Sequence, residues 1–195
     1  MRALRPLILL MTLGFGLAGV RPAIAGTPTD QLRERIDRAV GILEDGSLKA
    51  DPPARRAALR TVAQEIFDFT EFTKRALGPH WQKATPAERD ELVQLLSAQM
   101  ERAYMGRIEQ YSGGRITFVG ENVEGDLAVV RTRFVANSGE IPVDYRLARI
   151  GERWLAYDVS IEGISLVSSY RVQFNKIIQT SSTQGLMERL RARRE

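Results

Sequence analysis

The chain has 195 residues, no cysteine and one histidine, and its 28 basic against 24 acidic residues give a formal net charge of +4 at pH 7. The lack of cysteine excludes disulfides, thiolate metal sites and cysteine nucleophiles, and a lone histidine, His80, cannot build a typical zinc site. We therefore expect no metal and no cofactor, and a single domain that buries one core at this length.

Residues 1–25 have the features of a secretory signal peptide. Arg2 and Arg5 precede an apolar run of 14 residues, Leu7 to Val20, and Ala23-Ile24-Ala25 offers an A-x-A cleavage site before Gly26. The run is shorter than the roughly 20 apolar residues that a membrane-spanning helix needs. The pattern predicts export, cleavage before Gly26, and one mature domain over residues 26–195.

Cleavage would change the charge balance of the protein. It removes the arginines at positions 2, 5 and 21 and no acid, so the formal charge falls from +4 to +1. Such a chain gives no electrostatic support for a nucleic-acid partner. The remaining basic excess, at Arg189, Arg191, Arg193 and Arg194, is typical of a solvated helix end that complements the helix dipole. Contact with a membrane surface or a partner is the alternative.

Two helices are predicted before residue 80. The first opens at Thr27 and closes at Gly46, with Leu32, Ile36 and Leu43 at helical spacing. The second starts at Asp51-Pro52, a cap followed by proline, and runs to Gly78-Pro79. It includes three phenylalanines in the segment 67–72, which predict either ordinary core packing or one wall of a larger apolar cavity.

A third helix begins at the capping box Thr85–Glu88 and continues to about Tyr111. Its apolar stripe consists of Leu92, Leu96, Met100, Tyr104 and Ile108. Gly113-Gly114 ends the helix, and we interpret the pair as a helix-to-strand turn because no nucleotide-binding glycine pattern surrounds it.

The second half of the chain changes to strand periodicity. Strands are predicted at Ile116–Val119, Leu127–Val135, Ile141–Ile150 and Trp154–Ile161, with short turn segments between them. Short connections predict antiparallel neighbours. We therefore expect an α+β fold, with helices packed on one face of an antiparallel sheet of about four strands.

The stretch from Arg153 to Ile178 links the last strand to a final helix. Leu155, Tyr157, Val159 and Ile161 alternate and should share one buried face. After Glu162-Gly163, helical spacing places Ile164, Val167 and Phe174 on one side of the final helix. Strand and helix should cover the same apolar volume.

Few residues suggest chemistry. His80 is best explained as structural, and Asp158 and Glu162 are either caps of the strand-to-helix corner or an acid–base pair aided by the hydroxyls of Tyr145 or Tyr157. We predict no catalytic residue, because no nucleophile elbow or nucleotide loop is present. The excess of large apolar side chains indicates a solid core or a lipid cavity, and periodicity alone does not separate the two.

One long stretch is similar to a known family. WLAYDVSIEGISLVSSYRVQF, from Trp154 to Phe174, resembles the signature stretch of the MlaC family of periplasmic lipid carriers, also called toluene-tolerance proteins. The helical half agrees through Phe67–Phe69, Leu77-Gly78 with Trp81, and Lys83–Leu92. The similarity covers nearly the whole mature chain, and Val143-Asp144-Tyr145 is a looser match.

The resemblance implies an NTF2-like fold whose sheet and helices enclose an apolar pocket for phospholipid acyl chains. It also implies a periplasmic location, and partners in an outer-membrane MlaA-type lipoprotein with its porin and an inner-membrane ABC transporter with an MlaD-type subunit. Together with the apolar patterns, it predicts a lipid-binding set that consists of Phe67, Phe69, Leu96, Met100, Tyr104, Ile108, Val143, Tyr145, Leu147, Tyr157, Val159, Ile161, Ile164, Val167 and Phe174.

Two alternatives stay open at this stage. A related branch of the family accompanies hopanoid pathways, so a polycyclic lipid is one alternative ligand. NTF2-like folds also host small enzymes, because a fold does not dictate a function. Transport direction, headgroup preference, the number of acyl chains and the oligomeric state do not follow from the sequence.

Overall fold

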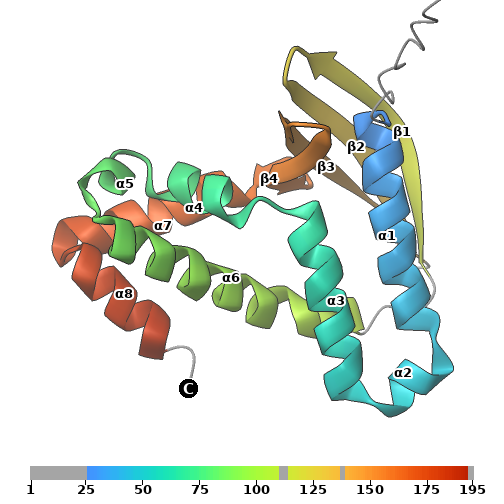
Figure 1. The fold of residues 1–195 in the computed structure, drawn as a ribbon, viewed down its shortest axis with the longest axis horizontal. Coiled ribbons are helices and arrows are strands. Elements are labelled where there is room, and N and C mark those ends of the chain that lie inside the picture. Colours follow the sequence, from blue (N-terminus) through green and yellow to red (C-terminus); the bar gives the residue numbers. More distant parts are fainter. Residues whose placement is uncertain (1–25, 110–113, 137–138, 193–195) are drawn as a thin grey trace, which may run out of the picture.

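The computed structural model describes residues 26–109, 114–136 and 139–192, and it has an α+β architecture (Figure 1). In these ranges the elements are α1 (Pro28–Glu44), α2 (Gly46–Ala50), α3 (Pro52–Ile66), α4 (Phe69–Leu77), α5 (Pro79–Lys83), α6 (Pro86–Glu109), β1 (Arg115–Glu124), β2 (Leu127–Ala136), β3 (Gly139–Ile150), β4 (Arg153–Ile161), β5 (Ile164–Ser165), α7 (Leu166–Thr180) and α8 (Thr183–Ala192).

The strands form one antiparallel sheet in the order β1-β2-β3-β4-β5. This confirms the predicted α+β fold and meander, with the two-residue β5 as an addition. The arrangement is compatible with the NTF2-like fold that the resemblance implies. Every helix in the described ranges is too short or too polar to cross a bilayer.

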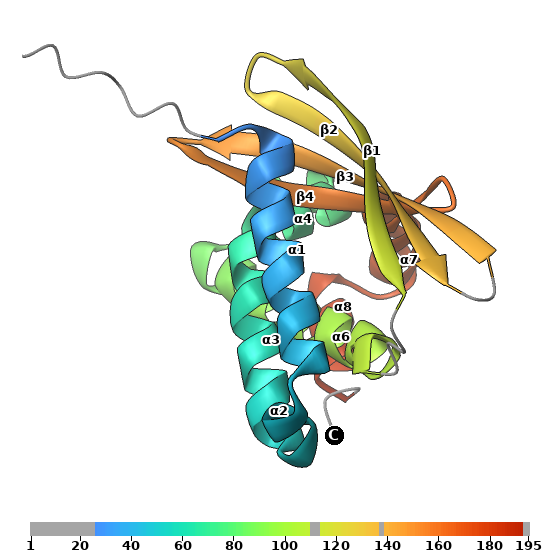
Figure 2. The same ribbon diagram turned by 90° about the vertical axis from the view of Figure 1, so that its right-hand side faces the viewer.

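Helices α1 and α3 lie side by side over one face of the sheet (Figure 2). Their apolar sides and the central strands bury a set of residues that we call the sheet core. It contains Leu32, Ile36, Val62, Ile66, Ala128, Val130, Leu147, Trp154 and Ala156. Thr27 caps α1 by accepting a hydrogen bond from the Asp30 amide at 3.1 Å, which confirms the predicted helix start.

Whereas α2 lies at the end of α1 and α3, helices α4 to α8 pack together beyond the β4 edge of the sheet rather than over its face (Figure 1). They enclose a second apolar set, which we call the helical core. It contains Phe72, Ala76, Leu77, Trp81, Ala84, Leu92, Leu95, Leu96, Met100, Val167, Phe174, Leu186, Met187 and Leu190. The predicted capping box opens α6: the Thr85 amide donates to the Glu88 carboxylate at 2.8 Å, and the Glu88 amide donates to the Thr85 hydroxyl at 3.3 Å. The prediction of one core for the whole domain was therefore too simple.

The second predicted helix is interrupted where the sheet core meets the helical core. Phe67 forms a parallel bridge with Ala156 of β4, and the Asp68 amide donates to the Ala156 carbonyl at 2.9 Å. The Asp68 side chain then caps α4 by accepting from the Glu71 amide at 2.9 Å. A continuous helix from 52 to 78 was wrong because this backbone pairing competes with helical hydrogen bonds.

Strand β4 contains an irregularity that changes which side chains share a face. Tyr145 pairs with Val159, but Leu147 pairs with Ala156, because the register shifts after Arg146. Residue 157 is the extra residue of this bulge. The prediction that Leu155 shares the face of Val159 and Ile161 was wrong, since the bulge reverses the alternation below it.

Four smaller features also differ from the predictions. A short additional helix, α2, starts at Gly46, where the first predicted helix was expected to close. Strand β1 extends to Glu124 rather than Val119. The final helix is divided at 181–182 into α7 and α8. Ile164 lies in β5 ahead of α7, not on the helix.

Candidate functional site

The face of the sheet under α1 and α3 is sealed at one end only. Strand alternation places Val130 of β2 and Leu147 of β3 on this face, and both are 0% exposed beneath the helices. Although Thr132 of β2 and Val159 of β4, on the same face, are 2% and 6% exposed, most of the apolar side chains further along the same strands are only partly buried. We call this second set the open apolar face; it consists of Ile116, Phe118, Phe134, Ile141, Val143, Tyr145 and Ile161.

Tyr145 lies where the sealed end of this face passes into the open end. Its residue is partly exposed, yet burial of the phenol raises the pKa of Tyr145 to about 12. Loss of hydration penalises the charged phenolate and leaves the neutral hydroxyl favoured. At this position the environment therefore disfavours a charged side chain, although the residue is partly exposed.

An aromatic pair joins the two cores beside this face. Phe67 packs against the sheet core and Phe69 against the helical core, and their ring centroids are 5.7 Å apart. Tyr104 of α6 is also only partly buried. Partly exposed apolar side chains thus come from the sheet, from the α3–α4 link and from α6.

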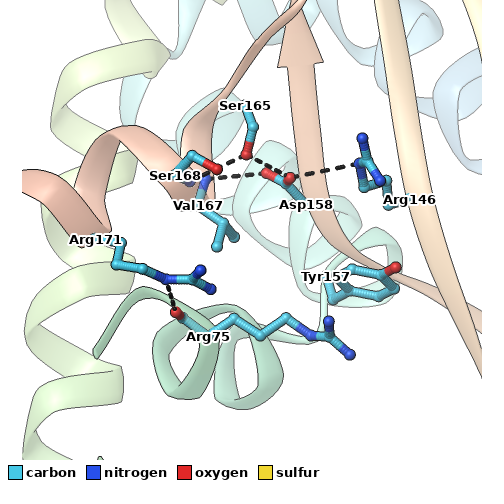
Figure 3. Close-up of a pocket in the computed structure, with 8 residues that line it drawn as sticks. All are labelled: Arg75, Arg146, Tyr157, Asp158, Ser165, Val167, Ser168 and Arg171. Atoms are coloured by element: carbon cyan, nitrogen blue, oxygen red, sulfur yellow. Dashed lines mark hydrogen bonds and ion pairs between the residues drawn. The ribbon is translucent and has the colours of Figure 1, made fainter. Parts of the chain in front are cut away.

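A separate polar hollow lies where α4 and α7 meet β4 (Figure 3). Asp158, 4% exposed, accepts hydrogen bonds from the Ser165 hydroxyl at 2.6 Å and from the Val167 amide at 3.0 Å. It thereby holds the first turn of α7 against β4 and fits the structural interpretation of this residue. Glu162, by contrast, is exposed in the turn between β4 and β5, at a φ of 51°.

A sequence model of the family described as MlaC protein matches residues 33–192. The chain belongs to the MlaC family. It is also 25% identical over 160 residues to the toluene tolerance protein Ttg2D of Pseudomonas putida, covering 80% of this chain and 74% of that protein.

A solved structure from Ralstonia solanacearum has the same fold. It is described as a phospholipid-binding protein in complex with a phospholipid, and it superposes with a TM-score of 0.77 at 24% identity. The likeness covers 87% of this chain and 97% of that one. At this level of identity the comparison establishes the fold, and it agrees with the α+β architecture described above.

The predicted lipid-binding residues of this MlaC-family chain fall into distinct environments. Leu96, Met100, Val167 and Phe174 are buried in the helical core, and Leu147 in the sheet core. Tyr157 and Val159 are buried on β4, at 9% and 6% exposure. Those that are partly exposed are Phe67, Phe69, Tyr104, Val143, Tyr145 and Ile161.

Two predicted residues do not fit the description of a buried lining. Ile164 is 64% exposed in β5, because the helix begins two residues later than its spacing suggested. Ile108 is 43% exposed near the end of α6. Four members of the open apolar face were missed: Ile116, Phe118, Phe134 and Ile141. Their alternation within the predicted strands was the available signal, but it needed the pairing register to assign them to one face.

Proposed function

We propose that the protein is a periplasmic carrier that binds the acyl chains of a phospholipid against the open apolar face. Membership of the MlaC family supports lipid carriage, and the phospholipid in the Ralstonia solanacearum structure, which has the same fold, supports the ligand class. The observation that carries the proposal is the change along the strands from fully buried to partly exposed apolar side chains.

The energetic argument concerns apolar surface that the protein itself leaves partly in water. Each buried methylene contributes about 0.8 kcal/mol, so covering the open apolar face with an acyl chain stabilises both the protein surface and the lipid. A free diacyl lipid leaves a membrane slowly for the same reason. A carrier needs only such a face, and no covalent step.

The wider assignment rests on the family. We propose export through the signal peptide of residues 1–25 and a single lipid-binding domain over residues 26–195. The carrier would exchange lipid between an outer-membrane MlaA-type lipoprotein with its porin and an inner-membrane ABC transporter with an MlaD-type subunit. The name of the Pseudomonas putida relative, a toluene tolerance protein, is in keeping with a role at the cell envelope.

The first experiment is a lipid extract of protein purified from the periplasm without detergent. We expect two-chain phospholipid by mass spectrometry. Detection of hopanoid in place of phospholipid would show that the ligand is a polycyclic lipid. Absence of any lipid would contradict the proposal that the protein is a lipid carrier. A reproducible hydrolase or isomerase activity would favour the enzyme alternative.

The second experiment tests where the lipid lies. Val143→Trp places a large ring on the open apolar face, and we expect it to fold and to carry less than about half of the wild-type lipid because the ring occupies the volume of the ligand. Ile150→Trp is the matched control, since Ile150 lies on the same strand but on the opposite face, 52% exposed. Equal lipid in the two folded variants would show that the open apolar face is not the binding surface.

A further inference from the structure

The polar hollow around Asp158 has a composition unlike that of the open apolar face. Its volume is about 240 Å³, and guanidinium groups reach it from Arg75 of α4, Arg146 of β3 and Arg171 of α7. The side chains of Ser165 and Ser168 also line it, at the start of α7. Figure 3 shows these groups arranged around one space, although they come from distant parts of the sequence.

Two of the three arginines donate a hydrogen bond through Nε, and the third is within ion-pair distance of a carboxylate. Arg75 Nε donates to the Glu71 carboxylate at 2.8 Å, and Arg171 Nε donates to the Arg75 carbonyl at 2.9 Å. Arg146 Nε lies 3.8 Å from the Asp158 carboxylate. In the described part of the chain, the hydrogen bonds orient Arg75 and Arg171, and the terminal nitrogens of all three arginines remain for another acceptor. The Arg75 guanidinium also stacks on the Tyr157 ring, 4.0 Å from its centroid.

The charges nearby do not cancel. Glu71 and Asp158 oppose the three arginines, and Lys74 shares the Glu71 carboxylate at 3.0 Å, which leaves a formal excess of two positive charges among these groups. Asp158 already accepts hydrogen bonds from Ser165 and the Val167 amide, so its oxygens are engaged on the side of α7. The first turn of α7 adds the positive end of a helix dipole.

We propose that this hollow binds a phosphate group. The terminal guanidinium nitrogens, which Nε hydrogen bonds pre-position in Arg75 and Arg171, match the several oxygens of a phosphate, which accept paired hydrogen bonds from arginine. The phosphate belongs either to a lipid headgroup or to a small soluble phosphate. The site stands on its own residues and does not depend on acyl-chain binding at the open apolar face.

The test begins with inorganic phosphate and the full exported protein. Calorimetric titration at an ionic strength of about 0.15 M should show saturable binding, because screening removes much of the non-specific attraction at that salt. Arg171→Gln should weaken it about tenfold, since it removes charge-assisted hydrogen bonds. Arg171→Lys keeps the positive charge but loses the paired donors of the guanidinium group. We therefore expect a loss of phosphate affinity smaller than that of Arg171→Gln.

A matched control removes the same charge elsewhere. Arg115→Gln changes an exposed arginine on β1, two strands from Arg146, and should leave phosphate affinity within about twofold of wild type. Melting curves without phosphate show whether each variant folds. An equal loss of phosphate affinity in Arg115→Gln and Arg171→Gln would refute the proposed site, because it would show that phosphate responds only to the overall charge of the protein.

Vesicles separate the two sources of phosphate. Binding to phosphatidylcholine vesicles that contain phosphatidic acid, but not to pure phosphatidylcholine, with competition by inorganic phosphate and loss in Arg171→Gln, would assign a lipid headgroup. Binding of inorganic phosphate without that vesicle response would assign a soluble phosphate. Saturable binding of neither would refute the proposal. Because the lipid extract reports on acyl chains and the titration on phosphate, either proposal can fail while the other stands.

Discussion

The helical core and the sheet core contain similar apolar side chains but cover them to different extents. In the helical core, Phe72, Leu92 and Leu96 are each 1% exposed or less, and α4, α6, α7 and α8 enclose them. In the sheet core, Val130 and Leu147 are equally buried, but Val143 and Tyr145 on the same face are not. Helices surround a core on several sides, whereas two helices cover only part of a long strand.

This difference separates stability from binding. Apolar side chains sealed on every side contribute their full transfer energy to folding, whereas those left partly in water keep part of it available for a ligand. The α3–α4 link and Asp158 hold the two regions together. The comparison can be tested by changes that should affect one region more than the other.

The largest effect is expected from truncation in the helical core. Phe72→Ala should lower the free energy of unfolding by about 3–5 kcal/mol, because it empties a site that the fold fills completely. Phe118→Ala on the open apolar face should cost less than about 2 kcal/mol in delipidated protein, since its ring is partly exposed beside the Arg33 guanidinium. Urea denaturation measures both. Equal losses would remove the distinction between sealed and open apolar regions.

A smaller loss is expected where the regions join. Asp158→Asn weakens the hydrogen bonds from Ser165 and from the Val167 amide, and should cost about 2 kcal/mol because the charged acceptor is lost. Asp144→Asn on the neighbouring strand is the control and should change stability by less than about 0.5 kcal/mol. If thermal and urea unfolding of the two variants coincided, Asp158 would not hold α7 to the sheet.

The environment of Tyr145 predicts a pH dependence at the alkaline end. The pKa of Tyr145 is raised to about 12, so its contribution to stability is complete below the ordinary tyrosine pKa of 10.0 and is lost as pH rises toward 12. The slope it adds should reach at most about 1.4 kcal/mol per pH unit. Tyr145→Phe should remove that slope between those pH values. Identical alkaline profiles for wild type and Tyr145→Phe would show that the phenol is hydrated.

The smallest effect concerns a surface contact between the two regions. Arg60 of α3 donates to Glu101 of α6 with Nε–Oε2 at 2.8 Å, and the hydrogen bond lowers the pKa of Glu101. A double-mutant cycle with Arg60→Gln and Glu101→Gln should give a coupling of about 0.2–1 kcal/mol, as both groups are partly exposed. The coupling should be present at neutral pH and disappear as the pH falls through the lowered pKa of Glu101. A coupling that persisted below that point would not come from the ion pair.

Much of the fold followed from local signals. The capping box at Thr85, the Thr27 cap and the turn segments between strands are short-range features, and the structure places helices and strands beside them. The break at Phe67-Asp68 was missed although Asp68 and Glu71 carry a capping pattern. The hydrophobic spacing continues across it, and only pairing with Ala156 shows that the helix stops.

The site was harder to predict than the fold. The sequence alone determined the apolar character of the strands, the order of the elements and the resemblance to the MlaC family. Tertiary structure decided which apolar residues are sealed, because the β4 bulge and the register of β1 with β2 set the faces. It also brought Arg75, Arg146 and Arg171 to one hollow, which no spacing in the chain could indicate. Periodicity reports how a side chain is oriented on its own element, whereas the cover it receives depends on elements that are distant in the sequence.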